Sequence, residues 1–161
     1  MPDSDVEHFF KKYILSPRGI IYRDIKQQID LAHTGKTGSG LLVALGLLSY
    51  TEFMGRILLK NDGSYTKQFR SFFRLLGEDY AAMIDNKEID VYAFFRSGLV
   101  QSYLSGDCEI RMTDENAAAG VILQPDGSFV FIVEKYFTDF LNACRKLQDD
   151  MLSDPDVYLP F

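Results

Sequence analysis

The sequence contains no tryptophan, only two cysteines and only two histidines among its 161 residues. Cys108 and Cys144 do not form a CxxC pair, and with two distant histidines they lack the ligand spacing of a zinc site. The longest apolar run, Leu41 to Leu48, is well short of the roughly 18 residues that a membrane span requires. We therefore expect no metal, no other cofactor and no membrane partner.

The N-terminus, MPDSDVEHFF, also lacks the basic segment and following apolar segment of a secretory signal peptide. Two isolated cysteines in a chain without such a signal are usually free thiols, which predicts a cytoplasmic protein. Apolar residues make up 47% and charged residues 25%, which is typical of a globular protein and excludes a disordered or fibrous chain. The length fits one domain over residues 1–161.

Hydrophobic spacing predicts a mainly α fold, with a bundle of five or six helices. A small antiparallel β-hairpin or three-stranded sheet precedes the C-terminal helix. The helical core covers about residues 4–104, and the hairpin with the final helix covers about residues 107–153. Pro125, Asp126 and Gly127 supply the hairpin turn. The glycine-rich stretch at 34–40 predicts a loop, and the apolar side chains near the C-terminus predict a tail that docks on the domain.

Two charges interrupt apolar stripes on the predicted helices. Glu52 falls in the middle of a stripe formed by Leu41, Leu45, Leu48, Gly55 and Leu59, and Arg96 falls in a stripe formed by Ile89, Tyr92, Leu99, Val100 and Tyr103. A charge on a core-facing stripe is costly unless it is paired, so the sequence predicts an ion pair between Glu52 and Arg96. Three roles remain open: a structural salt bridge, an oligomer interface centred on Arg96, or a catalytic or ligand-binding site.

The segment AFFRSGLVQSYL, which follows the apolar LLSYTEF helix, resembles HEPN domains over about residues 18–104. These all-helical bundles occur in many prokaryotic defence and toxin–antitoxin systems. Their motif is an Arg, often with a polar residue next to it, and a His after four to six further residues. Arg96 and Ser97 match the start of this motif, and Gln101 stands in the place of the His. The resemblance implies a homodimer with Glu52, Arg96, Ser97, Gln101 and Tyr103 at or near its interface.

In catalytic HEPN domains the resemblance implies metal-independent cleavage of RNA. That reaction needs a group that transfers a proton near neutral pH, which histidine can do and glutamine cannot. We therefore expect a non-catalytic relative. The alternative is an active ribonuclease in which Arg96, Glu52 and the distant His33 act together. His33 stands at the end of a predicted helix, where the helix dipole favours a histidine. A third alternative is a purely structural partner protein.

Charge is distributed unevenly along the chain. The net charge of −6 excludes diffuse nucleic-acid binding, but residues 55–76 carry +4 and residues 106–161 carry −7. The basic segment contains Arg56, Lys60, Lys67, Arg70 and Arg74. A basic helix face of this kind binds a phosphate backbone or an acidic protein partner, or it is simply solvated. The sequence thus predicts a homodimeric interaction module with RNA, a nucleotide or an acidic protein as candidate partners.

Overall fold

A computed structural model gives the fold of this chain and describes residues 3–35 and 40–154. The helices and strands follow one another as α1 Asp3–Phe10, η1 Lys11–Leu15, α2 Ile20–His33, α3 Gly40–Leu58, α4 Tyr65–Leu75, α5 Glu78–Asp85, η2 Tyr92–Ser97, α6 Leu99–Ser105, β1 Cys108–Arg111, β2 Val121–Leu123, β3 Phe129–Ile132 and α7 Val133–Ser153. The segments η1 and η2 are π-helical. The predicted glycine-rich loop and docking tail fall largely on residues 36–39 and 155–161, outside the described residues.

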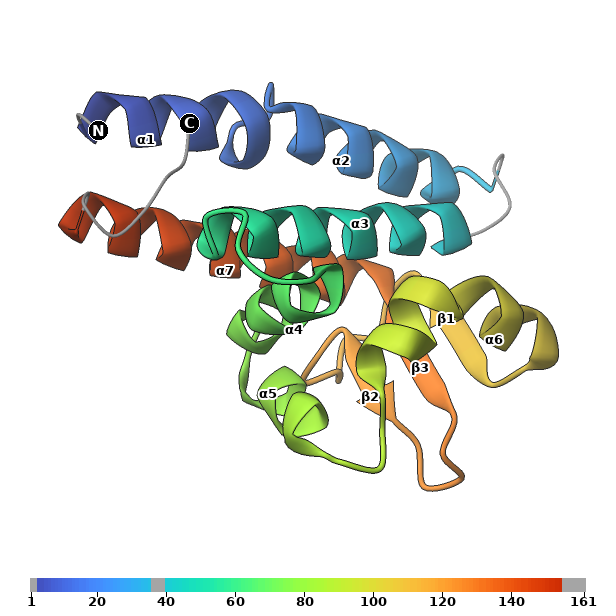
Figure 1. Ribbon diagram of the computed structural model, residues 1–161. Coiled ribbons are helices and arrows are strands. Elements are labelled where there is room, and N and C mark those ends of the chain that lie inside the picture. Colours follow the sequence, from blue (N-terminus) through green and yellow to red (C-terminus); the bar gives the residue numbers. More distant parts are fainter. Residues whose placement is uncertain (1–2, 36–39, 155–161) are drawn as a thin grey trace.

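The helices form layers around α3 (Figure 1). α1, η1 and α2 lie end to end along one side of the molecule, and α3 and α7 lie next to them. α4 and α5 cover the opposite side of α3, and the sheet lies beside them with η2 and α6. α3 packs against α2, α4 and α7, so it is the central helix of the bundle.

The prediction of a helical bundle with a small sheet before the C-terminal helix is confirmed. The described residues contain seven α-helices, more than the five or six that the sequence predicted. Gly77, with a φ of +154°, separates α5 from α4. At the end of the predicted helical core, η2 begins at Tyr92, and Gly98 separates η2 from α6.

α3 is the most apolar helix of the described residues. Its length and its mean hydropathy of 1.5 would allow it to cross a membrane, and it is the one helix in the described part of the chain that meets both criteria. The central helix of a soluble bundle meets the same criteria. Ala44, Leu47 and Thr51 have no measurable exposure, because their side chains face the other helices.

The sheet has the order β1-β3-β2. The predicted hairpin is present, since β2 and β3 pair antiparallel, and Gly127 occupies the turn with a φ of +85°. β1 lies parallel to β3 on its other side, with Cys108 opposite Phe129. All four residues of β3 are buried, so β3 is the central strand, and β1 and β2 are the edges of the sheet.

Most of the largest fully buried side chains are Phe and Tyr. Phe131 stacks on Tyr136 with ring centroids 4.7 Å apart, and this contact joins β3 to α7. α3 and α4 approach closely at Gly55, where an added Cβ would lie 1.7 Å from the backbone oxygen of Gln68. Only a residue without a side chain allows this approach. The tight packing of α3 on α4 fixes the direction in which the outer face of α4 points.

Candidate functional site

Glu52 and Arg96 form an ion pair within one chain. Arg96 Nε donates a hydrogen bond to Glu52 Oε2 at 3.0 Å, and Tyr92 Oη donates to the same oxygen at 3.4 Å. The side chain of Glu52 is 17% exposed and that of Arg96 is 36% exposed. The contact links α3 to η2, two segments that the sequence predicted to be neighbours.

Both charges lie at the edge of the core, and the prediction that they lie in the middle of core-facing stripes is wrong. The centre of the buried face of α3 is one residue away, at Leu47 and Thr51. In the η2 and α6 region the buried residues are Phe95 and Leu99, next to Arg96. The sequence does not separate the centre of a buried face from its rim, because an apolar residue at the rim of a core has the same hydrophobicity as one at its centre.

The other residues of the predicted motif are exposed. Ser97 ends η2, while Gln101 and Tyr103 belong to α6, and all three side chains reach solvent. In the described part of the chain no hydrogen bond joins Gln101 to Arg96. The π-helical turn that contains Arg96 is a local widening of the helix, a feature frequent at functional sites.

His33 lies away from the ion pair. Its Nε2 contacts Glu134 Oε1, so it joins the end of α2 to the start of α7. Gly40, at the start of α3, packs against Val133, the residue next to Glu134 in α7. Glu52 lies twelve residues further along α3. At 1.5 Å per residue, about 18 Å of helix separates Glu52 from this end of the molecule. The structure therefore brings together Glu52 and Arg96 but not His33.

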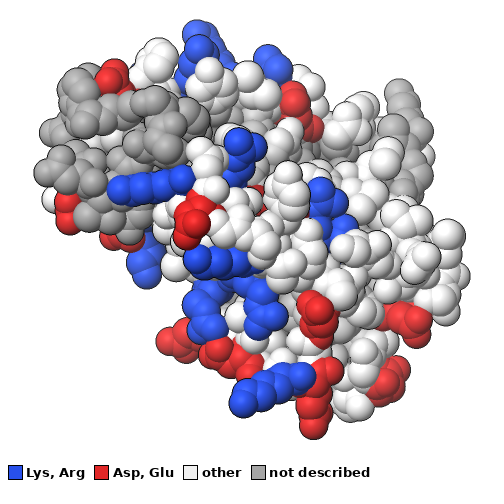
Figure 2. Space-filling view, in the orientation of Figure 1, with Lys and Arg blue, Asp and Glu red and all other residues white. Residues whose placement is uncertain are grey.

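Three of the five predicted basic residues line one open groove on the outer face of α4. Lys67, Arg70 and Arg74 share this groove of about 430 Å³ with the hydroxyl groups of Ser64, Thr66 and Ser71. Figure 2 shows Lys and Arg side chains gathered over the region of α4 and α5. The opposite face of α4 carries Phe69, Phe72 and Phe73, all fully buried, which orients the basic residues outward.

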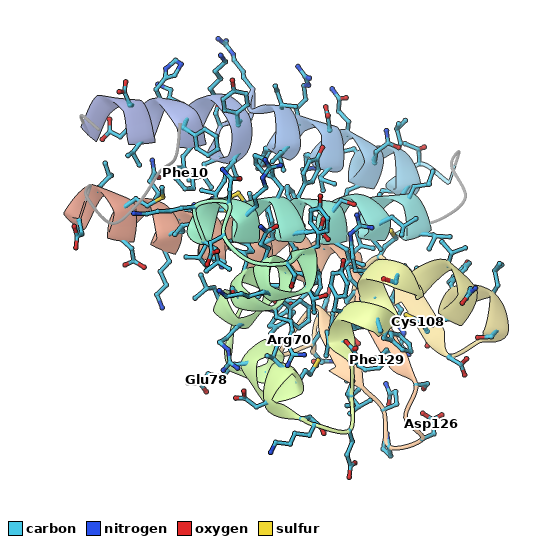
Figure 3. All side chains as sticks on the ribbon, viewed as in Figure 1. Phe10, Arg70, Glu78, Cys108, Asp126 and Phe129 are labelled. Atoms are coloured by element: carbon cyan, nitrogen blue, oxygen red, sulfur yellow. The ribbon has the colours of Figure 1, made fainter. Side chains whose placement is uncertain are left out.

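The groove residues also connect α4 to its surroundings. Arg70 projects towards α5 (Figure 3) and donates a hydrogen bond to the Ile84 carbonyl at 2.9 Å. Arg74 donates two hydrogen bonds to Asp85, and these bonds lower the pKa of the Asp85 carboxyl. Lys67 Nζ lies 3.2 Å from Asp62 and lowers the pKa of Asp62 in the same way.

In the described part of the chain, Lys67 and Arg74 are each paired with a carboxylate, whereas Arg70 is not. Among the described residues no carboxylate forms an ion pair with Arg70, which donates its hydrogen bond to the uncharged carbonyl of Ile84. The groove therefore keeps positive charge beside three hydroxyl donors. Cationic side chains with hydroxyl groups are the donors that bind phosphate oxygens.

Arg56 and Lys60 do not line this groove. Arg56 lies in the last turn of α3 and its Nε contacts Asn61 Oδ1. Lys60 follows in the turn after α3, where its φ is +52°. The basic segment thus divides into two parts, because the turn at 59–64 separates the end of α3 from the outer face of α4.

A buried polar network near the sheet was missed by the sequence analysis. Tyr80 Oη donates to Asp139 Oδ2 at 2.7 Å and accepts a hydrogen bond from the Gly120 N–H at 2.7 Å. Lys135 Nζ contacts the other oxygen of Asp139. Burial and the adjacent carboxylate raise the pKa of Tyr80, so its hydroxyl keeps its proton and donates to Asp139. The available signal was an acid at position 139 on the apolar face of the final helix.

The described residues offer few groups for metal binding or nucleophilic catalysis. No cluster of three or more His, Cys, Asp or Glu side chains in residues 3–35 and 40–154 has the arrangement of a metal site. Burial raises the pKa of Cys108 to about 11 and that of Cys144 well above its usual value, so both thiols are poor nucleophiles.

Comparisons with known proteins give no family for this chain. No protein-family model, no curated protein and no solved structure matches it. The residues of the site therefore carry the functional argument.

Proposed function

We propose that this protein is a non-catalytic binding module that contacts the phosphate groups of RNA through the groove of α4. The observation that carries the proposal is the convergence of Lys67, Arg70 and Arg74 with three hydroxyl groups on one exposed surface. The groove offers charge and hydrogen-bond donors to a phosphate without a pocket that selects a base. Such a surface binds the RNA backbone with little sequence preference.

The proposal excludes catalysis for chemical reasons. Arg96 is paired with Glu52, and the neighbouring Gln101 cannot transfer a proton. His33 is paired with Glu134 at another end of the molecule. The alternative of a metal-independent ribonuclease needs Arg96, Glu52 and His33 to meet. Arg96 is already paired with Glu52, and His33 lies far from both, which supports a binding role instead.

A homodimer is part of the proposal, with α6 at its interface. Val100 is 44% exposed and Leu104 is 77% exposed, and these residues lie four positions apart on one face of α6 together with Tyr103. A contiguous exposed apolar surface is a common mark of a protein–protein contact. The likeness of this segment to HEPN domains, and with it a defence or toxin–antitoxin setting, stays a prediction.

RNA binding is tested by fluorescence anisotropy with a labelled single-stranded RNA at several salt concentrations. Three phosphate contacts predict a slope of about −2 for log affinity against log salt, at about 0.7 for each contact. The double variant Lys67→Glu/Arg74→Glu is expected to reduce this slope by about 1.4. The matched control is Arg145→Glu/Lys146→Glu, which changes the charge equally on the exposed face of α7. Equal loss in both variants would contradict a site in the groove.

The ribonuclease alternative has its own test. The same RNA is incubated with the protein in the presence of a metal chelator and then separated by size. We expect intact RNA. Cleavage that disappears in Arg96→Ala would establish the ribonuclease and overturn the non-catalytic proposal. Sedimentation of Leu104→Asp beside the natural chain tests the dimer separately, because this variant is expected to be monomeric.

A further inference from the structure

The outer edge of β2 presents main-chain groups without partners. Gln124 N–H donates to Ser128 O at 2.8 Å, which places Gln124 among the residues whose main-chain groups point towards β3. Because these groups alternate along an antiparallel strand, the N–H and C=O groups of Val121 and Leu123 point away from β3. In the described part of the chain no segment forms a hydrogen bond with them.

An open groove of about 470 Å³ lies beside this edge. Met83 of α5, the alanines at 117–119 and the side chains of β2 line it. The alanine side chains are small and leave room, and Leu123 remains 36% exposed at one end. The surface combines unpaired main-chain donors and acceptors with an apolar depression, which is the combination that binds an extended peptide by strand addition.

The edge is held in place before any ligand binds. Gly120, which immediately precedes β2, donates its N–H to Tyr80 Oη at 2.7 Å and to Asp139 Oδ2 at 3.3 Å. An added Cβ at Gly120 would lie 2.3 Å from the backbone nitrogen of Tyr136, so the strand begins tight against α7. A fixed edge spares a ligand the entropic cost of ordering it.

Two carboxylates on the groove select the occupant by charge. Asp79 of α5 and Asp114 of the preceding loop both line it. Asp114 is bonded to Arg111 at 3.4 Å and to the Asn116 N–H at 3.0 Å, whereas in the described residues Asp79 forms no ion pair. A second copy of this chain, joined edge to edge by a two-fold axis, would bring four such acids together. The acids therefore favour a basic partner over a second copy.

We propose that the outer edge of β2 and the adjoining groove bind an extended peptide that carries an apolar side chain and a Lys or Arg side chain two positions apart, on the same face of the added strand. The peptide adds a fourth strand to the sheet through the N–H and C=O groups of Val121 and Leu123. One of its apolar side chains enters the groove against Met83, and a basic side chain meets Asp79. The site is separate from the α4 groove, so this inference does not rest on RNA binding.

The first test is titration with a capped hexapeptide that carries valine and lysine in turn at every second position, with threonine between them, followed by amide NMR shifts. We expect shifts concentrated at Val121, Ile122 and Leu123, and none with the same peptide in which glutamate replaces lysine. Asp79→Asn is expected to weaken binding about two- to five-fold, as for the loss of an exposed ion pair. The matched control is Glu78→Gln, the adjacent acid of α5, which does not line the groove. Equal binding of the acidic peptide would overturn the proposal.

The second test removes single main-chain hydrogen bonds. Leu123→Pro deletes an N–H that points away from β3, a position where a strand edge tolerates proline. We expect binding to weaken about 3- to 10-fold, which corresponds to one hydrogen bond, with Leu123→Ala as the control for the lost side chain. Two peptides N-methylated at alternate positions repeat the test without changing the protein, and only one of them should still bind. If both bind as well as the parent peptide, strand addition is wrong.

Sedimentation of the unliganded protein tests whether a second copy of the chain occupies the edge of β2. We expect the edge to be free. A dimer that dissociates in Leu123→Pro would show that a second copy occupies the edge, and it would overturn the peptide proposal.

Discussion

Arg96 Nε lies 3.0 Å from Glu52 Oε2, and the arginine side chain is about twice as exposed as the carboxylate that it binds, at 36% against 17%. The carboxylate therefore depends on the arginine more than the arginine depends on the carboxylate. Tyr92 Oη, 3.4 Å away, is the second donor to the same oxygen. The pair joins the central helix to the segment that precedes the exposed stripe of α6.

Replacement of Arg96 by methionine is expected to lower the free energy of unfolding by about 1 to 2 kcal/mol, because Glu52 loses a charged hydrogen bond in a half-buried position. Arg111→Met is the control, since Arg111 pairs with Glu109 on the surface and its loss costs less than about 1 kcal/mol. Urea unfolding followed by far-UV circular dichroism measures both. Equal losses would show that Glu52 and Arg96 are coupled no more strongly than a surface pair.

Tyr80→Phe removes the hydroxyl between Gly120 and Asp139 while it keeps the ring in the core. We expect a loss of about 1 to 3 kcal/mol, because a buried carboxylate oxygen and a buried N–H both lose a partner. Tyr65→Phe removes the same group from a side chain that is 66% exposed, and it should leave stability unchanged. The urea midpoints of the two variants separate the effects. An unchanged midpoint for Tyr80→Phe would mean that water replaces the hydroxyl.

Stability is expected to fall as the pH rises from about 9 towards 11. The thiol of Cys108 titrates near 9.0 when it is free, whereas burial raises its pKa to about 11 in the folded chain. Between these values the unfolded chain releases a proton that the folded chain retains, so unfolding becomes more favourable. Burial also raises the pKa of Cys144, which adds to the same trend. Urea midpoints measured across this range should decline less steeply for Cys108→Ala.

Thiol labelling checks the same cause by another route. Both cysteines are buried, so a thiol reagent should react slowly with the folded protein at pH 8 and rapidly after urea is added. Fast labelling of the folded protein would contradict the raised pKa of Cys108.

The sequence predicts the helices and the hairpin well because these depend on residues near one another. Phe69, Phe72 and Phe73 fix the buried face of α4 by their spacing alone, and the turn at Gly127 is a local signal. The parallel pairing of β1 with β3 was not predicted. Nothing in a short strand identifies its partner, because that choice depends on which edge remains open after the hairpin forms.

The sequence predicts the candidate site only where a charged residue interrupts a run of apolar residues. Glu52 and Arg96 stand out as charges among apolar residues, and their pairing follows from opposite sign. Arg74 does not stand out in this way, and its partner Asp85 comes from another helix whose position depends on the break at Gly77. The division of the basic segment into a groove and a separate helix end also depends on tertiary packing.

The packing of α1 has a consequence for the order in which the chain folds during synthesis. α1 carries Val6 and Phe10, both buried, and apart from the adjoining η1 its main partner is α7 at the other end of the sequence. The apolar side chains of α1 therefore wait until α7, which is synthesised much later, has left the ribosome before they find their final surface. During that interval the nascent protein exposes the apolar face of α1 formed by Val6 and Phe10, and exposed apolar surface of this kind is what chaperones bind.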